Sequence, residues 1–106
     1  MKYTNYTNMD ARFMRTYEPG DRLVRGWQGE LDDIWLTNES LTGLAEIVYG
    51  IHNRDDRPDG RMCPSMSVGD VVVIGEVALS VDLAGFKVVQ LDANDILPTT
   101  YLETVR

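Results

Sequence analysis

The fold predicted for this chain depends most on residues 68–74, Val68-Gly69-Asp70-Val71-Val72-Val73-Ile74. Its four consecutive β-branched residues, at positions 71–74, are apolar on both faces of an extended backbone, which is typical of a strand at the centre of a sheet. Gly69 and Asp70 favour a turn before the strand, because glycine adopts positive φ and aspartate hydrogen-bonds to nearby backbone. The sequence therefore predicts a central strand that follows directly after a Gly-Asp turn.

The residues after this strand predict an antiparallel β-meander. Residues 75–76 can turn the chain, and residues 77–81 and 86–91 have the apolar and β-branched composition of strands. Residues 82–85 are the expected turn or bulge between these two strands. Near the end of the chain, residues 100–103 match a capping box and predict a short terminal helix.

Upstream, the sequence predicts an N-terminal β-hairpin. Residues 11–17 mix aromatic, β-branched and polar side chains, and residues 22–28 alternate in polarity, so both segments are expected to be strands. Residues 18–21 (EPGD) join them with the composition of a type II turn, in which proline sets a negative φ and glycine accepts a positive one. Residues 1–10 are polar, and we expect them to be a loose arm or an edge strand.

A Gly-Asp pair precedes two of the expected strands, at Gly20-Asp21 and at Gly69-Asp70. In each case glycine can supply the turn and aspartate can bond to the local backbone. We interpret this similarity as shared turn chemistry rather than as a structural repeat.

The clearest helical pattern lies between the hairpin and the meander. Apolar residues recur at the i, i+3, i+4, i+7 and i+10 spacing of one helix face, at Leu41, Leu44, Ala45, Val48 and Ile51. The pattern predicts one main helix over about residues 38–52, packed by its single apolar stripe on one face of the sheet. Residues 54–67 contain Pro and Gly breakers and predict a long loop.

Length and composition indicate one domain. Because two halves of about 50 residues would each be too small for a comfortable core, we expect residues 1–106 to form a single α+β domain. Cys63 is the only cysteine, which excludes an intramolecular disulfide. No apolar run approaches the ~20 residues that span a bilayer, and the polar start does not match a signal peptide. These features predict a cytoplasmic protein without a membrane partner.

Catalytic and metal-binding patterns are sparse. A structural zinc site needs four Cys or His ligands, and this chain has one of each, Cys63 and His52. His52 with Asp55, Asp56 and Asp59 keeps a small metal-dependent hydrolase open as an alternative, although acids that alternate with arginines are typical of a solvated surface. We interpret Cys63 as a buried, inert thiol, and no phosphate-binding glycine motif occurs. We therefore favour a non-enzymatic protein and expect no cofactor.

Arginine and aromatic side chains form the candidate binding surface. Arginines interleaved with aromatic rings can stack nucleobases, can form a protein interface, or can divide into an aromatic core face and an outer arginine face. The formal net charge of −7, from 17 acids against 10 bases, favours a protein partner over nucleic acid, which stays an alternative. The candidate binding residues are Arg12, Arg15, Arg25, Trp27, Trp35, Arg54 and Arg57.

Three segments carry a family resemblance. Residues 18–24 (EPGDRLV), 53–58 (NRDDRP) and 65–72 (SMSVGDVV) are similar to segments of small uncharacterised accessory proteins of actinobacteriophages, mycobacteriophages especially, and of actinobacterial mobile elements. The resemblance covers about residues 11–90. It implies a phage accessory protein of the host cytoplasm that binds a host or phage protein, in host modulation or counter-defence. It implies no particular reaction, and no catalytic residues follow from it.

Overall fold

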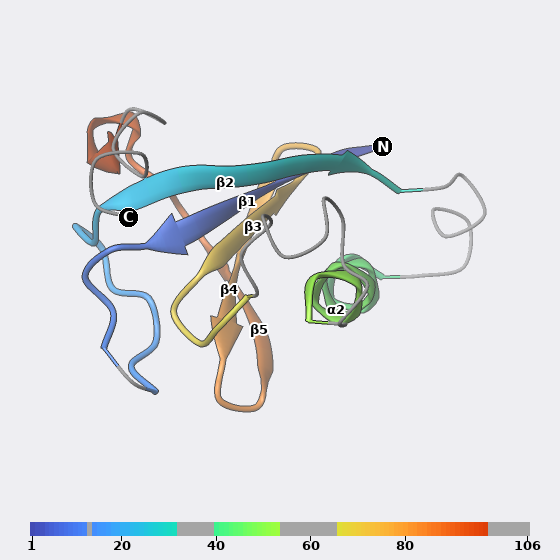
Figure 1. Cartoon of the computed structure of the whole chain (residues 1–106), viewed down its shortest axis with the longest axis horizontal. Coiled ribbons are helices and arrows are strands. Elements are labelled where there is room, and N and C mark those ends of the chain that lie inside the picture. Colours follow the sequence, from blue (N-terminus) through green and yellow to red (C-terminus); the bar gives the residue numbers. More distant parts are fainter. Residues whose placement is uncertain (13, 32–39, 54–65, 98–106) are drawn as a thin grey trace.

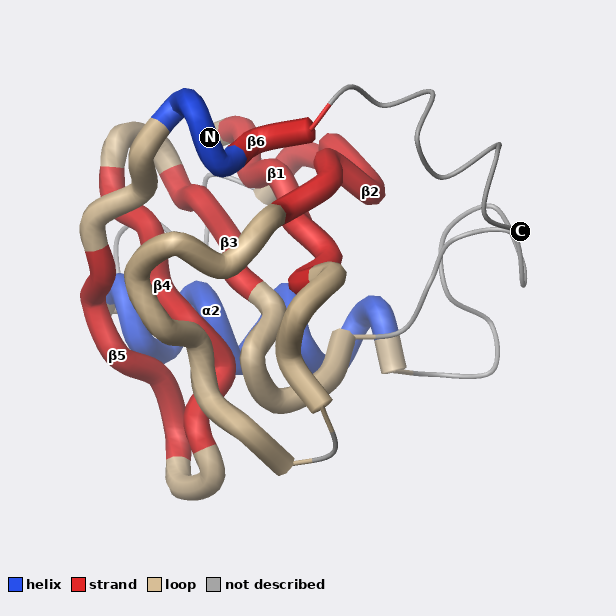
Figure 2. The backbone as a smooth tube through the Cα atoms, turned by 90° about the vertical axis from the view of Figure 1, so that its left-hand side faces the viewer, coloured by secondary structure: helices blue, strands red, loops and turns tan. Residues whose placement is uncertain are grey.

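Six strands form one sheet, and a single long helix covers one of its faces in the computed structural model (Figures 1 and 2), which describes residues 1–12, 14–31, 40–53 and 66–97. The strand order is β5-β4-β3-β1-β2-β6, antiparallel except for the parallel pair of β2 and β6. The elements are β1 (Lys2–Asn8), β2 (Leu23–Glu30), α2 (Leu41–His52), β3 (Val71–Ile74), β4 (Val77–Asp82), β5 (Gly85–Val89), the 3₁₀ turn η2 (Ala93–Asp95) and β6 (Ile96–Leu97). The predicted α+β class is confirmed.

The strand β3 lies in the interior of the sheet, as its apolar composition predicts. It pairs with β1 on one side and with β4 on the other, and Val71, Val72 and Ile74 are almost completely buried. The chain continues from β3 into β4 and β5 as the predicted antiparallel meander. Gly75 makes the first turn with a φ of 62°, and Gly85 opens β5 with a φ of 109°.

The N-terminal hairpin is present, but the prediction of its first strand is wrong. β1 consists of residues 2–8, which were expected to be a loose arm or edge strand, and it pairs on both sides, with β2 and with β3. Of residues 11–17, those that the structure describes form a loop. The Asn8 side chain ends β1, because its Oδ1 accepts hydrogen bonds from the backbone N–H of Asp10 and of Ala11, both at 2.9 Å.

Pairing with β2 also explains why Tyr3 fits in the core. Tyr3 lies opposite Gly29, and a Cβ atom on Gly29 would stand only 2.5 Å from the Tyr3 ring. Glycine therefore leaves room for the ring to cross the neighbouring strand. The Tyr3 hydroxyl then reaches the ring Nε2 of His52, 2.9 Å away on α2, and this contact ties the hairpin to the helix.

The helix α2 begins and ends near the predicted limits. Ser40 caps its start by accepting a hydrogen bond from the Gly43 N–H at 3.1 Å, and Asn53 caps its end. Leu44, Ala45 and Val48 of the predicted stripe are buried against the sheet. In the described part of the chain, no helix is long and apolar enough to cross a membrane.

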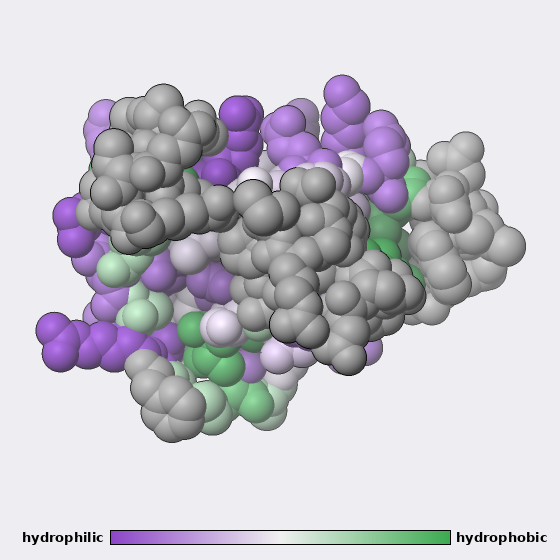
Figure 3. Space-filling view, in the orientation of Figure 1, coloured by the Kyte–Doolittle hydropathy of each residue, from purple (hydrophilic) through white to green (hydrophobic). Residues whose placement is uncertain are grey.

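Two clusters of buried apolar side chains form the core, one on each face of the sheet. The larger one lies under α2 and contains Tyr3, Val72, Ile74 and Leu79 with the helix stripe. The smaller one lies on the other face and contains Tyr17, Leu23, Val71 and Ala78. Outside these clusters, Figure 3 shows hydrophobic side chains gathered over the β4–β5 end of the molecule, where Leu83 is 62% exposed and Val88 is 61% exposed.

Candidate functional site

The two Gly-Asp turns have the same local geometry. In the first turn, Asp21 N–H donates to the Glu18 carbonyl at 3.0 Å, and Asp21 Oδ2 accepts from Glu18 N–H at 3.0 Å. In the second, Asp70 N–H donates to the Ser67 carbonyl at 3.0 Å, and Asp70 Oδ2 accepts from Ser67 N–H at 2.9 Å. The glycine before each aspartate has a φ of 96°. The interpretation of shared turn chemistry therefore agrees with the geometry of both turns.

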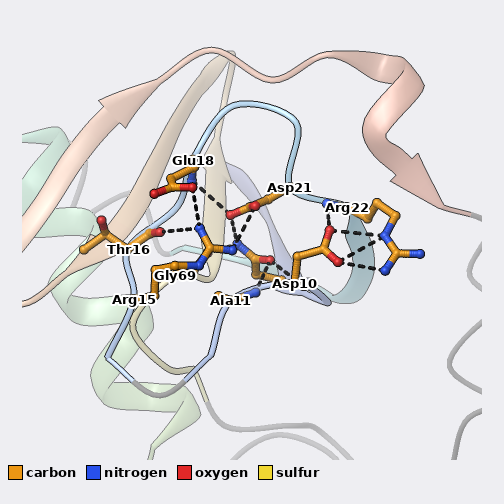
Figure 4. Close-up of polar contacts among 9 residues, drawn as sticks. Asp10, Ala11, Arg15, Thr16, Glu18, Asp21, Arg22 and Gly69 are labelled. Atoms are coloured by element: carbon orange, nitrogen blue, oxygen red, sulfur yellow. Dashed lines mark hydrogen bonds and ion pairs between the residues drawn. The ribbon is translucent and has the colours of Figure 1, made fainter.

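Asn8 joins the two turns at the end of β1. Its Nδ2 donates to Asp21 Oδ2 and to the Gly69 carbonyl, and its backbone N–H donates to Asp70 Oδ1, all at 2.9 Å. Arg15 adds an ion pair to Asp21 at 2.9 Å and one to Glu18 at 3.1 Å (Figure 4). This network holds the 18–21 turn and Arg15 close to the 67–70 turn.

The two aspartates differ in electrostatics. Burial raises the pKa of Asp70 from its ordinary 3.8 to about 6, although the N–H groups of Asn8 and Ser67 partly oppose this effect. Burial also raises the pKa of Asp21, but hydrogen bonds from Arg15, Asn8 and the Glu18 N–H outweigh burial, so the pKa lies below 3.8. Of these two aspartates, only Asp21 forms an ion pair with a described residue, Arg15.

A cleft of about 520 Å³ lies beside this network, and we call it the loop-helix cleft. Met14 and Tyr49 line it with exposed side chains, 50% and 36% accessible, and Arg12 lines it as an exposed cation. Met14 has a φ of 63°, a region that non-glycine residues rarely adopt. The lining residues are Thr7, Asn8, Ala11, Arg12, Met14, Tyr49, Met66, Ser67, Val68 and Asp70.

A second, much smaller cavity adjoins this cleft. It measures about 10 Å³ and shares Thr7, Met66 and Asp70 with the loop-helix cleft. Asn5 also lines it, and this side chain is only 7% exposed. Neither Asn5 Oδ1 nor Asn5 Nδ2 has a hydrogen-bond partner in the described structure. A buried amide without partners is rare in proteins, and each such group calls for an explanation.

Another large cavity, of about 670 Å³, lies on the face opposite α2, between Tyr17 and the segment from Lys87 to Ala93. None of the side chains that line it has a buried polar atom that lacks a partner. The loop-helix cleft adjoins the small cavity that holds the unpaired amide of Asn5, and it is therefore the better candidate site.

The structure distributes the predicted binding residues over several places. Arg12 lines the cleft, whereas Arg15 is engaged by Asp21 and Glu18. Arg25 is exposed on β2 and has no ion pair within the described ranges, and Trp27 packs against the larger cluster with its ring 6.5 Å from that of His52. Trp35, Arg54 and Arg57 lie outside the described residues.

Three residues of the site were missed from the sequence. Tyr49 lies off the apolar stripe of the helix, and that position is a signal for an exposed aromatic ring. Asn5 shares the alternation that places Tyr3 under the helix, so a buried amide could have been expected there. Nothing in the sequence indicates that Met14 has positive φ.

His52 has a structural environment. It is completely buried, hydrogen-bonds to Tyr3 and packs edge-on against the Tyr3 ring at a centroid distance of 5.6 Å. The other members of the alternative metal site, Asp55, Asp56 and Asp59, lie outside the described residues, as does Cys63. Within the ranges that the structure describes, no group of three or more His, Cys, Asp or Glu side chains could hold a metal ion.

No protein-family model matches the chain, and comparisons with curated proteins and with solved structures find no match. The chemistry of the cleft itself therefore has to support the functional proposal.

Proposed function

We propose that this chain is a non-enzymatic binding module whose partner is a host or phage protein, bound in the loop-helix cleft. One observation carries the proposal: Met14 and Tyr49, two large exposed side chains, line the same cleft as Arg12. Methionine, tyrosine and arginine are enriched at the centres of protein interfaces. The cleft volume of about 520 Å³ is large enough to take side chains of a partner segment.

The backbone around Met14 supports this proposal. A positive φ at a non-glycine residue costs free energy and persists only where the surroundings hold it, which is a pattern often found at binding sites. Here Arg15, the next residue, is fixed by its bonds to Asp21 and by its N–H bond to the Arg12 carbonyl at 2.9 Å. The loop thus presents Met14 in a preorganised position, which lowers the entropy lost on binding.

The net charge of −7 also supports a protein partner, because nucleic-acid binding relies on excess Lys and Arg. The resemblance of residues 53–58 and 65–72 to actinobacteriophage accessory proteins suggests where the partner is found. On this proposal the protein acts in the cytoplasm of an actinobacterial host.

A charge placed in the cleft tests the proposal. The tagged chain and its Met14→Asp variant are used to capture proteins from an actinobacterial lysate, and any captured protein is purified and titrated by calorimetry. Aspartate tolerates positive φ better than methionine does, so the variant is expected to fold. Leu83→Asp is the matched control, because Leu83 is exposed to 62% against 50% for Met14 but does not line the cleft.

We expect Met14→Asp to weaken the partner's affinity at least tenfold and Leu83→Asp to leave it unchanged. A partner that tolerates Met14→Asp but is lost with Leu83→Asp would place the interface on the β4–β5 end instead. A chain that binds no protein would remove the proposal altogether.

A further inference from the structure

We propose that the loop-helix cleft recognises a carboxamide group, carried by an asparagine or glutamine side chain of the partner, and that Asn5 is the residue that binds it. This inference rests on the proposed function, because the group must come from a segment seated in the cleft. Asn5 is more than nine-tenths buried, and both of its amide atoms lack protein partners. Such a side chain destabilises the folded protein unless another molecule completes its hydrogen bonds.

The neighbours of Asn5 explain why the fold does not satisfy it. Asn5 lies opposite Trp27 on one side and Val72 on the other, and both of these belong to the helix-side core. Asp70 also lines the small cavity, but its two carboxylate oxygens accept bonds from Asn8 and Ser67 and neither bonds to Asn5. The Asn5 amide therefore lies between two apolar side chains of the core, and neither Thr7 nor Asp70, two polar side chains that line the small cavity with it, bonds to it.

The chemistry of Asn5 selects the ligand. Its Oδ1 needs a donor and its Nδ2 needs an acceptor, and a carboxamide offers both side by side. A carboxylate offers acceptors only, and the acid Asp70 in the same cavity disfavours a second negative charge. An ammonium group offers donors only. A hydroxyl offers both functions on one atom, whereas a carboxamide places a donor and an acceptor on two atoms with the same spacing as those of Asn5. A carboxamide can therefore form one direct hydrogen bond with each of the two Asn5 atoms.

Met66 controls access to Asn5. It lines both cavities and is itself buried, and the small cavity of about 10 Å³ has room for about one water molecule. A carboxamide therefore reaches Asn5 only if the lining that the two cavities share, Thr7, Met66 and Asp70, opens, and we infer that Met66 is the side chain that moves. Methionine is unbranched and adapts its conformation readily, so this movement is inexpensive.

The inference can be tested without a known partner. A library of short random peptides is displayed, and peptides that bind the intact chain are selected. We expect the selected peptides to share an Asn or Gln, and replacement of that residue by Met to weaken binding about tenfold, or about 1.4 kcal/mol. On the Asn5→Leu chain both peptides should bind equally weakly, because the two changes remove the same contact. The matched control is Thr4→Val, which lies in the same strand opposite Val73 and should leave the affinity unchanged.

Thermal unfolding separates a binding role from a structural one. If Asn5 serves the ligand, Asn5→Leu raises the melting temperature while it weakens peptide binding. A lowered melting temperature with unchanged affinity shows that Asn5 is structural and overturns the inference. If the variant does not fold, the side-chain amide signals of Asn5 in the native chain are followed by NMR, and signals that do not move with bound peptide also overturn it.

The two proposals fail in different ways. Peptides that lose affinity with Met14→Asp but ignore Asn5→Leu support the binding module and remove the carboxamide. Peptides that ignore Met14→Asp, or a selection that enriches none, remove the proposed function and with it this inference.

Discussion

The turns at residues 18–21 and 67–70 have the same hydrogen bonds and the same glycine φ of 96°. The pKa of the aspartate is nevertheless lowered in the first turn and raised in the second. Asp21 is paired with Arg15, whereas Asp70 lies beside residues 66–68 and β1 and has no ion pair with any residue that the structure describes. Local sequence determines the shape of such a turn, because glycine and aspartate suffice to form it. The three-dimensional surroundings determine its charge state.

The two turns also differ in packing. A Cβ atom on Gly69 would lie 2.6 Å from the Cβ of Ala11 and 2.7 Å from the Arg15 carbonyl, whereas a Cβ on Gly20 would meet nothing within 4 Å. The second turn is therefore pressed against the loop that lines the candidate site, while the first lies open on its outer side. Substitutions at equivalent positions should reveal this difference.

The largest expected effect comes from alanine at the two glycines. Gly20→Ala should lower the free energy of unfolding by about 1 kcal/mol, the cost of placing an L residue at positive φ. Gly69→Ala should lower it by about 3 kcal/mol or more, because the backbone of Arg15 must also move. Urea unfolding of both variants measures the difference, and equal losses would show that the second turn is not tightly packed.

A smaller effect is expected from pH. Because the folded-state pKa of Asp70 is about 6, above its ordinary 3.8, the folded chain binds a proton there that the unfolded chain releases. Its contribution to stability is therefore present at low pH and decreases as the pH rises through 6. Relative to Asp70→Asn, the unfolding free energy of the native chain should rise by about 1 kcal/mol from pH 7 to pH 5.

Asp21 should show the opposite dependence. Its pKa is lowered, so its contribution is present above 3.8 and is lost as the pH falls below that value. Urea unfolding of Asp21→Asn and Asp70→Asn, measured from pH 7 to below pH 3.8, checks the direction in which each aspartate changes the unfolding free energy with pH. If the two variants follow parallel pH curves, the electrostatic difference between the turns does not exist.

The smallest effect is expected from Arg15→Gln, which makes the first turn resemble the second. The ion pair is partly exposed, so the loss of stability should stay within about 1 kcal/mol. The pKa of Asp21 should nevertheless rise, because burial is then opposed only by Asn8 and the Glu18 N–H. An NMR titration of the Asp21 carboxyl group measures this rise, and an unchanged pKa would mean that Arg15 is not the cause.

Some elements could be predicted because their determinants are local. The run of four β-branched residues at 71–74 identified an interior strand, and the stripe from Leu41 to Ile51 identified the helix. The hairpin was misplaced because residues 2–8 are polar, and their strand is stabilised by pairing on both sides rather than by its own propensity. Residues 11–17 have a suitable composition for a strand, but the strand β1 has already ended before them. The Asn8 side chain accepts hydrogen bonds from the backbone N–H groups of Asp10 and Ala11, and these bonds form a turn.

The candidate site was less predictable than the fold. Arg12 was identified, but the cleft arises because Met14 from a loop, Tyr49 from the helix and Met66 from a distant segment meet around it. Each of these residues alone is unremarkable in sequence. Their meeting depends on the hydrogen bonds of Asn8, which join segments more than 60 positions apart in the chain.

Four features follow from the amino-acid sequence alone: the fold class, the buried central strand, the helix and the two Gly-Asp turns. Each of them depends on periodicity or on the conformational preferences of neighbouring residues. Three other features arise only in the folded chain: β1 is an interior strand, Asp70 and Asp21 differ in pKa, and Asn5 is buried without partners among the described residues. Those properties depend on which distant groups surround a residue. Burial and hydrogen bonding between distant segments are established only when the chain folds, so they cannot be predicted from the neighbours of a residue in the sequence.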